Sequence, residues 1–149
     1  MEATFESPFT ASSPNNPAAD DGLLAVAPGA DIPLLPDHNL KLGASTRIVD
    51  GLLVGMDFRY QDGIHLRGDE ANLDEKTDAW HTVEVYARIS PAKWWFAEAR
   101  VDNLLNEDYE TFGLYGEADE VLENVQDNSG RFLGPAPPRI WWLTVGLRF

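Results

Sequence analysis

The sequence predicts an all-β protein, an antiparallel up-and-down sheet of about five strands joined by alternately short and long connections. Apolar and polar residues alternate in five segments of about ten residues, which is the period of a strand with two different faces. Tight turns follow the first and third segments, at 49–51 and 91–93, where Asp-Gly and Pro are typical turn residues. Long acidic stretches follow the second and fourth segments, and little helix is expected.

Each predicted strand has one apolar face. In the first four segments these faces consist of Leu40, Leu42, Ala44 and Ile48; Leu52, Val54, Met56, Phe58 and Tyr60; Val83, Val85, Ala87 and Ile89; and Trp95, Ala97, Ala99 and Val101. In the C-terminal segment the apolar face is formed by Trp141, Leu143, Val145, Leu147 and Phe149, and the other face by Trp142, Thr144, Gly146 and Arg148. Leu53, Phe96 and Trp142 each add one apolar residue to a mostly polar face.

The connecting stretches hold the negative charge. Of the formal net charge of −14, residues 1–37, 61–78 and 104–137 contribute −6, −4 and −7, whereas the strand blocks 38–60, 79–103 and 138–149 contribute +1, 0 and +2. Residues 11–36 are expected to be irregular loop, residues 4–9 the tail of a preceding strand, and residues 117–125 a turn or two of helix.

Strand length and loop asymmetry favour a transmembrane β-barrel segment. Strands of about ten residues span a bilayer at the tilt of a barrel, and outer-membrane barrels have short periplasmic turns and long extracellular loops. Counted back from a periplasmic C-terminus, both tight turns fall on the periplasmic side. Tyr60, Trp94, Trp95 and Phe149 lie at strand ends, as an interfacial aromatic girdle requires; core packing is the alternative for these aromatics.

Composition excludes several other classes. The acidic excess argues against nucleic-acid partners and against docking on an anionic membrane surface. The absence of cysteine excludes disulfides, thiol nucleophiles and Cys-ligated metals. No nucleophile–base pairing or phosphate loop is found, so we expect no enzyme, no catalytic residue and no cofactor.

Several segments together resemble the TonB-dependent receptors of Gram-negative outer membranes. Residues 139–149 look like a terminal barrel strand ending in Phe, 101–111 is similar to the family's V-x-N-L-x-(D/N)-x-x-Y-x-T signature, and 32–43 resembles its I-P-x-x-P-x-H-x-L-K-L-G segment. Residues 66–72 and 9–16 look like loops of the same family. The segments occur in the family's order over most of the chain.

The resemblance implies that residues 1–149 are the C-terminal part of a receptor barrel, with 1–37 an extracellular loop region and 38–149 five strands. Family members have a 22-stranded barrel, an N-terminal plug, a box that contacts TonB and a signal peptide. None of the last three is recognised here, so a fragment that reaches TonB only through a missing N-terminal part is expected. The intact receptor would take up a ferric siderophore, cobalamin or a sugar, and its partners would be outer-membrane lipid, the remaining barrel and the plug.

The candidate site residues belong to two groups. Trp141, Leu143, Val145, Leu147 and Phe149 would be the signal for the barrel-assembly machinery, or else half-buried strand residues of a soluble domain. Tyr109, Phe112 and Tyr115 would contact an incoming ligand, or else hold the last loop against the barrel rim, which is the commoner role of such aromatics.

Two other groups are assigned no site. His38, His65 and His81 lack metal-ligand spacing. The acidic run Asp69, Glu70, Asp74, Glu75 and Asp78 lacks the pattern of a calcium loop and is expected to face water.

A different class stays open as the alternative function. A small soluble β-domain would use the apolar sheet face to bind a partner, or close a small barrel by oligomerisation. Such a domain buries that face under a second layer, whereas a membrane barrel leaves it bare.

Overall fold

The computed structural model describes residues 3–117 and 130–148, which contain nine strands and no helix. Accordingly, no described segment is a helix of the length and hydropathy needed to cross a membrane. The expected helical turn at 117–125 lies, apart from Glu117, outside the described residues.

The chain divides into two compact units. The sheet unit consists of Asn39–Gln61, Trp80–Asp108 and Pro137–Phe149, and the loop unit of Met1–His38, Asp62–Ala79 and Tyr109–Ala136. These boundaries lie within one residue of those between the predicted strand blocks and acidic stretches, except that the sheet unit extends to Asp108 rather than to residue 103.

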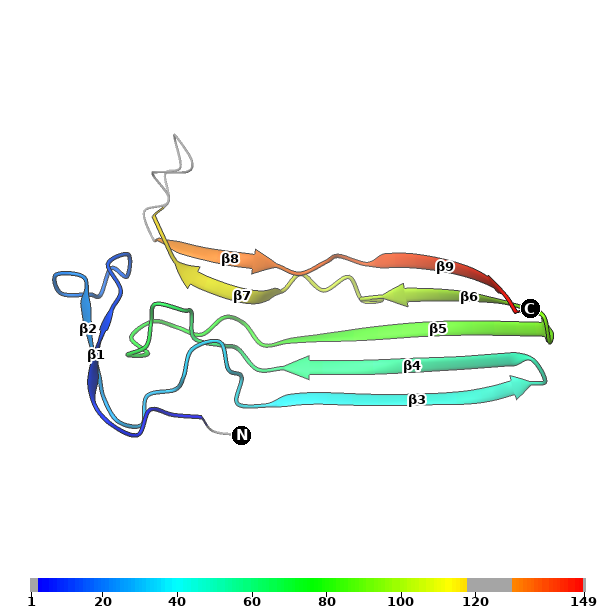
Figure 1. Ribbon diagram of the computed structural model, residues 1–149, viewed down its shortest axis with the longest axis horizontal. Coiled ribbons are helices and arrows are strands. Elements are labelled where there is room, and N and C mark those ends of the chain that lie inside the picture. The colour runs from blue at the N-terminus through cyan, green and yellow to red at the C-terminus, as the bar shows by residue number, and fades with distance from the viewer. Residues whose placement is uncertain (1–2, 118–129, 149) are drawn as a thin grey trace. The chain divides into compact units, whose positions relative to one another are not determined.

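The sheet unit is one antiparallel layer (Figure 1). Its strands, in spatial order, are β3 (Asn39–Val49), β4 (Leu52–Gln61), β5 (Trp80–Ala92), β6 (Trp95–Asp102) and β9 (Ile140–Leu147). They coincide with the five predicted strands, because each has enough alternating residues to show the period clearly. The sheet is open, and β3 and β9 are its edges.

The first tight turn has the predicted composition. Asp50 and Gly51 join β3 to β4, and Gly51 has a φ of +84°. Residues with a side chain avoid this conformation. A Cβ at this position would also lie 2.8 Å from the carbonyl oxygen of Ser90, so the turn requires glycine.

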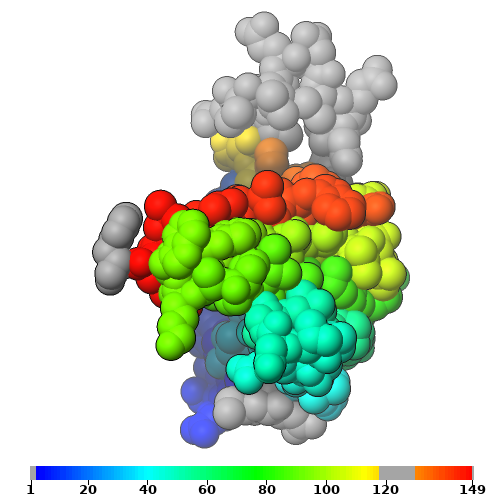
Figure 2. Space-filling model, turned by 90° about the vertical axis from the view of Figure 1, so that its right-hand side faces the viewer, coloured from blue at the N-terminus to red at the C-terminus, as the bar shows by residue number. Residues whose placement is uncertain are grey.

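The second tight turn is displaced from its predicted position at 91–93. Pro91 and Ala92 still belong to β5, and Lys93 and Trp94 form the turn. A register irregularity between Ile89 and Ala92 accommodates the proline, which has no N–H to donate. The chain end lies beside this turn, since the Arg148 N–H donates to the Trp94 carbonyl (2.7 Å); Figure 2 shows the green turn region next to the red end of β9.

The loop unit contains strands that the sequence did not predict. β1 (Phe9–Ser12) pairs with β2 (Leu23–Val26), and β7 (Glu110–Tyr115) pairs with β8 (Arg131–Pro135). The expectation of irregular loop over residues 11–36 is therefore wrong for β2 and the end of β1. The expected strand tail at 4–9 is also wrong in extent: Thr4 makes an isolated bridge to Asp31, and the strand begins at Phe9.

The loop unit also has a core of its own. Its buried apolar side chains are Leu24, Val26, Ile64, Leu66 and Tyr115. Segment 64–68 bonds to other parts of this unit through its backbone: the His65 carbonyl accepts from Leu34 N (3.0 Å), and Arg67 exchanges two bonds with β7. The described parts of the acidic stretches thus fold together rather than extending separately into water.

Candidate functional site

The sheet unit carries one continuous apolar face. The cross-strand register places Leu42 opposite Phe58, Met56 opposite Val85, and Ala99 opposite Leu143, so the apolar residues of adjacent strands lie side by side. On β9 the side chains are strongly exposed: Trp141 72%, Leu143 78%, Val145 65% and Leu147 57%. Because the unit is a single layer, it contains no second sheet to cover them.

The opposite face is polar and carries ion pairs and cation–π contacts. The Arg100 guanidinium lies 3.7 Å from Glu84 and 3.0 Å from Asp102. Trp142 donates its indole N–H to Asp102 (2.7 Å). Arg88 lies 3.7 Å from Glu98 and 3.8 Å from the ring centre of Phe96. The two faces therefore suit two different environments, one apolar and one aqueous or polar.

Asp69 organises the acidic segment of the loop unit. Its side chain is only 1% exposed, and its two carboxylate oxygens accept the backbone N–H groups of Leu73 (2.8 Å) and Asp74 (3.1 Å). Asn72, with a φ of +54°, exchanges hydrogen bonds with the backbone of Asp31. The expectation that this acidic run faces water is therefore wrong for Asp69, whose carboxylate shapes the loop instead.

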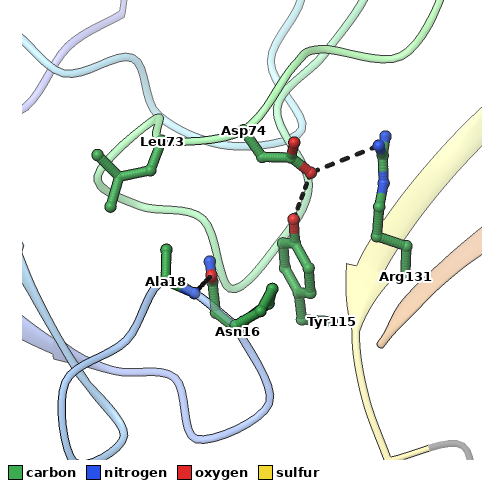
Figure 3. Close-up of a pocket in the computed structure, with 7 residues that line it drawn as sticks. Asn16, Ala18, Leu73, Asp74, Tyr115 and Arg131 are labelled. Carbon is green, nitrogen blue, oxygen red and sulfur yellow. Dashed lines mark hydrogen bonds and ion pairs between the residues drawn. The ribbon is translucent and has the colours of Figure 1, made fainter. Parts of the chain in front are cut away.

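Asp74, Tyr115 and Arg131 meet at an open pocket of about 240 Å³ (Figure 3). Tyr115, at the end of β7, donates its hydroxyl to Asp74, and Arg131, at the start of β8, lies 3.4 Å from the same carboxylate. The remaining lining residues are Asn16, Pro17, Ala18 and Leu73.

These contacts move two pKa values in opposite directions. The hydrogen bond from Tyr115, helped by a backbone N–H and by Arg131, lowers the pKa of Asp74 against the effect of its burial. Burial, and then the Asp74 carboxylate, raises the pKa of Tyr115. The pair is therefore held as a neutral phenol and a charged carboxylate.

A second polar cluster joins distant segments of the loop unit. Lys76 lies 2.8 Å from Asp37 and 3.0 Å from Asp31. The hydrogen bond to Asp37 raises the pKa of Lys76, and the same bond lowers the pKa of Asp37. His65 is buried, with Nδ1 3.5 Å from Asp69. In the described ranges no group of three or more His, Asp or Glu residues could hold a metal ion.

The structure brings the predicted residues of β9 together on one face but separates the three predicted ligand-contact aromatics. Trp141, Leu143, Val145 and Leu147 share one face of an edge strand, as alternation requires, whereas Phe149 lies outside the described residues. Tyr109 precedes β7, and strand alternation puts Phe112 and Tyr115 on opposite faces of that strand. Tyr115 lies in the core of the loop unit and Phe112 is 39% exposed, so the structure does not gather the three aromatics at one point.

The residues that sequence reasoning missed are Ser13, Asn16, Asp69 and Arg131. Ser13 and Asn16 both donate to the Gly68 carbonyl, at 2.6 and 2.8 Å. The one usable signal was local: Asn16 followed by Pro17 is a turn signature, and its side chain accepts the Ala18 N–H (2.9 Å). The contacts of Ser13 and Asn16 with Gly68, and of Arg131 with Asp74, join residues more than 40 positions apart in sequence, whereas Asp69 bonds to the backbone four and five positions along the chain.

Comparison with known proteins gives a fold-level result. No protein-family model and no curated protein matches the chain. Among solved structures, the ferric-catecholate import receptor Fiu of E. coli K12 is similar in its open form, with 20% identity over 85% of this chain and a TM-score of 0.59. Its closed form gives 19% identity over 77% of this chain and a TM-score of 0.57. The chain spans 17% and 14% of those structures, and the likeness is one of fold.

Proposed function

We propose that these residues form part of the barrel of an outer-membrane TonB-dependent receptor. The observation that carries the proposal is the two-sided sheet: five adjacent strands share an apolar face, which is most strongly exposed on β9, and a polar, ion-paired face. A membrane barrel needs this arrangement, because its outer surface meets lipid and its inner surface meets water or protein. The fold likeness to Fiu supports the same assignment.

In this proposal each face and each unit has a role. The apolar face contacts outer-membrane lipid, and β9 is the strand by which the barrel-assembly machinery recognises the protein. The polar face lines the lumen and meets the remaining barrel and the plug. The loop unit stands outside the cell, where its acidic segments are solvated.

The intact receptor would take up a scarce nutrient by energy-coupled transport. Fiu is a ferric-catecholate import receptor, and a siderophore-like ligand is accordingly the first substrate class to test, with cobalamin and sugars next. Ligand contact by Tyr109, Phe112 or Tyr115 remains part of this proposal. Phe112 is a better candidate than Tyr115, because Phe112 is exposed whereas the hydroxyl of Tyr115 donates a hydrogen bond to Asp74.

The test compares two arginine substitutions at neighbouring positions of β9. Leu143→Arg puts a charge on the lipid face, where it should cost about 2–4 kcal/mol near the middle of the bilayer. Thr144→Arg puts the same charge on the polar face. Membrane fractionation of cells expressing each variant should show loss of Leu143→Arg, but not of Thr144→Arg, from the outer membrane.

The alternative, a soluble module with an apolar binding face, predicts a different outcome. In a soluble domain, Leu143→Arg would leave the protein in the soluble fraction and reduce its aggregation, since an exposed apolar patch is an aggregation hazard. Recovery of both the parent and the Leu143→Arg variant in the soluble fraction would therefore reject the membrane assignment.

A further inference from the structure

We propose that the register of the sheet is set on its polar face, where the side chain of a phenylalanine, tyrosine or aspartate of one strand fills the space over a glycine of the next. A seam is here the line along which two neighbouring strands pair. Three of the four seams, β3–β4, β4–β5 and β6–β9, carry such a pair, and the fourth carries an ion pair. This inference does not rest on the proposed function, because it concerns contacts within the sheet unit.

The apolar face cannot select the register by itself. A slip of one residue would exchange the two faces, but a slip of two returns every apolar side chain to the same side. Leu143, Val145 and Leu147 are similar in size, and the larger Trp141 is 72% exposed, so a two-residue slip of β9 changes little of the area buried on that face. A side chain that fits only one partner must therefore supply the discrimination.

The β6–β9 seam has the most complete arrangement. Phe96 is directly opposite Gly146, and a Cβ at Gly146 would overlap the phenyl ring. Arg88 of β5 lies 3.8 Å from the centre of that ring, and Arg148 lies 5.6 Å from it. The ring thus lies across the glycine and is held there by two cation–π contacts.

The other seams repeat the principle with different side chains. Tyr86 of β5 is opposite Gly55 of β4, and a Cβ there would overlap the phenol ring. Asp57 of β4 lies over Gly43 of β3 in the same way. On the β5–β6 seam, the directly opposed pair is Arg88 and Glu98, 3.7 Å apart.

A two-residue slip at the β6–β9 seam would remove the fit. Phe96 would then face Thr144 or Arg148, neither of which leaves the space over the backbone that the ring occupies. We therefore assign Phe96 as a positioning residue for the C-terminal strand, acting through Gly146.

Disulfide trapping in the full chain, folded in detergent micelles, tests this assignment. The chain has no cysteine, so introduced pairs are the only thiols. Ala97→Cys with Val145→Cys reports the observed register, because these residues are directly opposed. Ala97→Cys with Leu143→Cys, or with Leu147→Cys, reports the two slipped registers; a displacement of two residues, about 7 Å along the strand, prevents bridging without movement.

In the parent background we expect the first pair to dominate. Phe96→Ala should lower the ratio of in-register to slipped disulfides by about fivefold, the effect of one strong cross-strand pair. Gly146→Ala should do the same by occupying the space under the ring, whereas Phe96→Tyr should leave the ratio unchanged.

Two further variants keep the test decisive. Trp95→Ala is the matched control, because it removes an aromatic from the same strand on the apolar face; the ratio should be unchanged. The exchange Phe96→Gly with Gly146→Phe should restore the ratio, since ring and glycine are again opposed. An unchanged ratio in Phe96→Ala and Gly146→Ala, or an equal loss in Trp95→Ala, would overturn the assignment.

Discussion

Charged side chains in the loop unit act as structural bonds as well as solvated surface. Asp69 is buried and accepts two backbone N–H groups, and a buried carboxylate needs such partners because desolvation otherwise favours its neutral form. Asp74 accepts a hydrogen bond from the Tyr115 hydroxyl and forms an ion pair with Arg131. The Asp69 hydrogen bonds shape segment 69–74, and the contacts of Asp74 tie this segment to β7 and β8.

The Asp74–Tyr115 pair predicts how the stability of the loop unit depends on pH. The pKa of Tyr115 is raised, so its contribution is complete below its ordinary value of 10.0 and is lost as the pH rises above that value. The pKa of Asp74 is lowered, so its contribution is complete above its ordinary value of 3.8 and is lost as the pH falls below it. The contribution of the pair to the free energy of unfolding should therefore be constant between these two pH values.

Tyr115→Phe isolates this effect in denaturant unfolding at a series of pH values. At neutral pH the variant should lose about 1.5–3 kcal/mol of stability, the value of a hydrogen bond to a charged group, and it should lose less stability at alkaline pH than the parent does. In a tyrosinate absorbance titration the parent should show a late-titrating tyrosine that the Tyr115→Phe variant lacks. Titration curves of the two proteins that end at the same pH would contradict the assignment.

Such residue contacts lay beyond sequence analysis for a physical reason. Tyr115 and Asp74 are 41 positions apart, and only the fold of three separate segments brings them together. An acidic run in a sequence is usually solvated, and nothing local distinguishes Asp69 from its neighbours.

At the scale of elements, strand length decided what could be predicted. The strands of the sheet unit have 8 to 13 residues and repeat the two-residue period several times. Those of the loop unit have 4 to 6 residues and show it once or twice, as in β2, where only Leu24 and Val26 are buried. Such short strands are stabilised by pairing with a partner strand, and this pairing cannot be recognised from a few residues of sequence.

The Asp50-Gly51 turn between β3 and β4 requires glycine at position 51, and a substitution there tests this requirement. Gly51→Ala should destabilise the sheet unit by about 1–2 kcal/mol or more, because strain at positive φ adds to a clash with the Ser90 carbonyl. Gly29→Ala is the matched control: its φ is +91°, but nothing lies within 4 Å of the new Cβ, so only the strain remains. Denaturant unfolding compares the two, and an equal or smaller effect at Gly51 would show that the clash is relieved.

At the scale of the molecule, charge separates the two units. The ranges of the loop unit hold 18 acidic and three basic residues, and those of the sheet unit seven acidic and eight basic residues, giving −15 and +1. This partition follows from environment: residues in a sheet with one apolar and one ion-paired face carry balanced charge, and solvated segments can carry a large excess. The net charge of the whole chain is therefore a property of the loop unit.

In the proposed receptor barrel, the apolar face of the sheet unit contacts lipid and the polar face does not. The most direct test of this claim is a scan of single cysteines along β9, at positions 141–145 and 147, in the protein expressed in Gram-negative cells and labelled in intact outer membranes; Gly146 is left unchanged because a side chain there would displace Phe96. The parent chain, which has no cysteine, is the unlabelled control.

The reactivity of the introduced cysteines should alternate along β9 with a period of two residues. Cysteines at 142 and 144 should react with a charged maleimide, and those at 141, 143, 145 and 147 should resist it, because a thiol that faces lipid stays protonated and out of reach of the charged reagent. Equal reaction of both sets with the charged reagent, or recovery of the labelled protein in the soluble fraction, would contradict the claim.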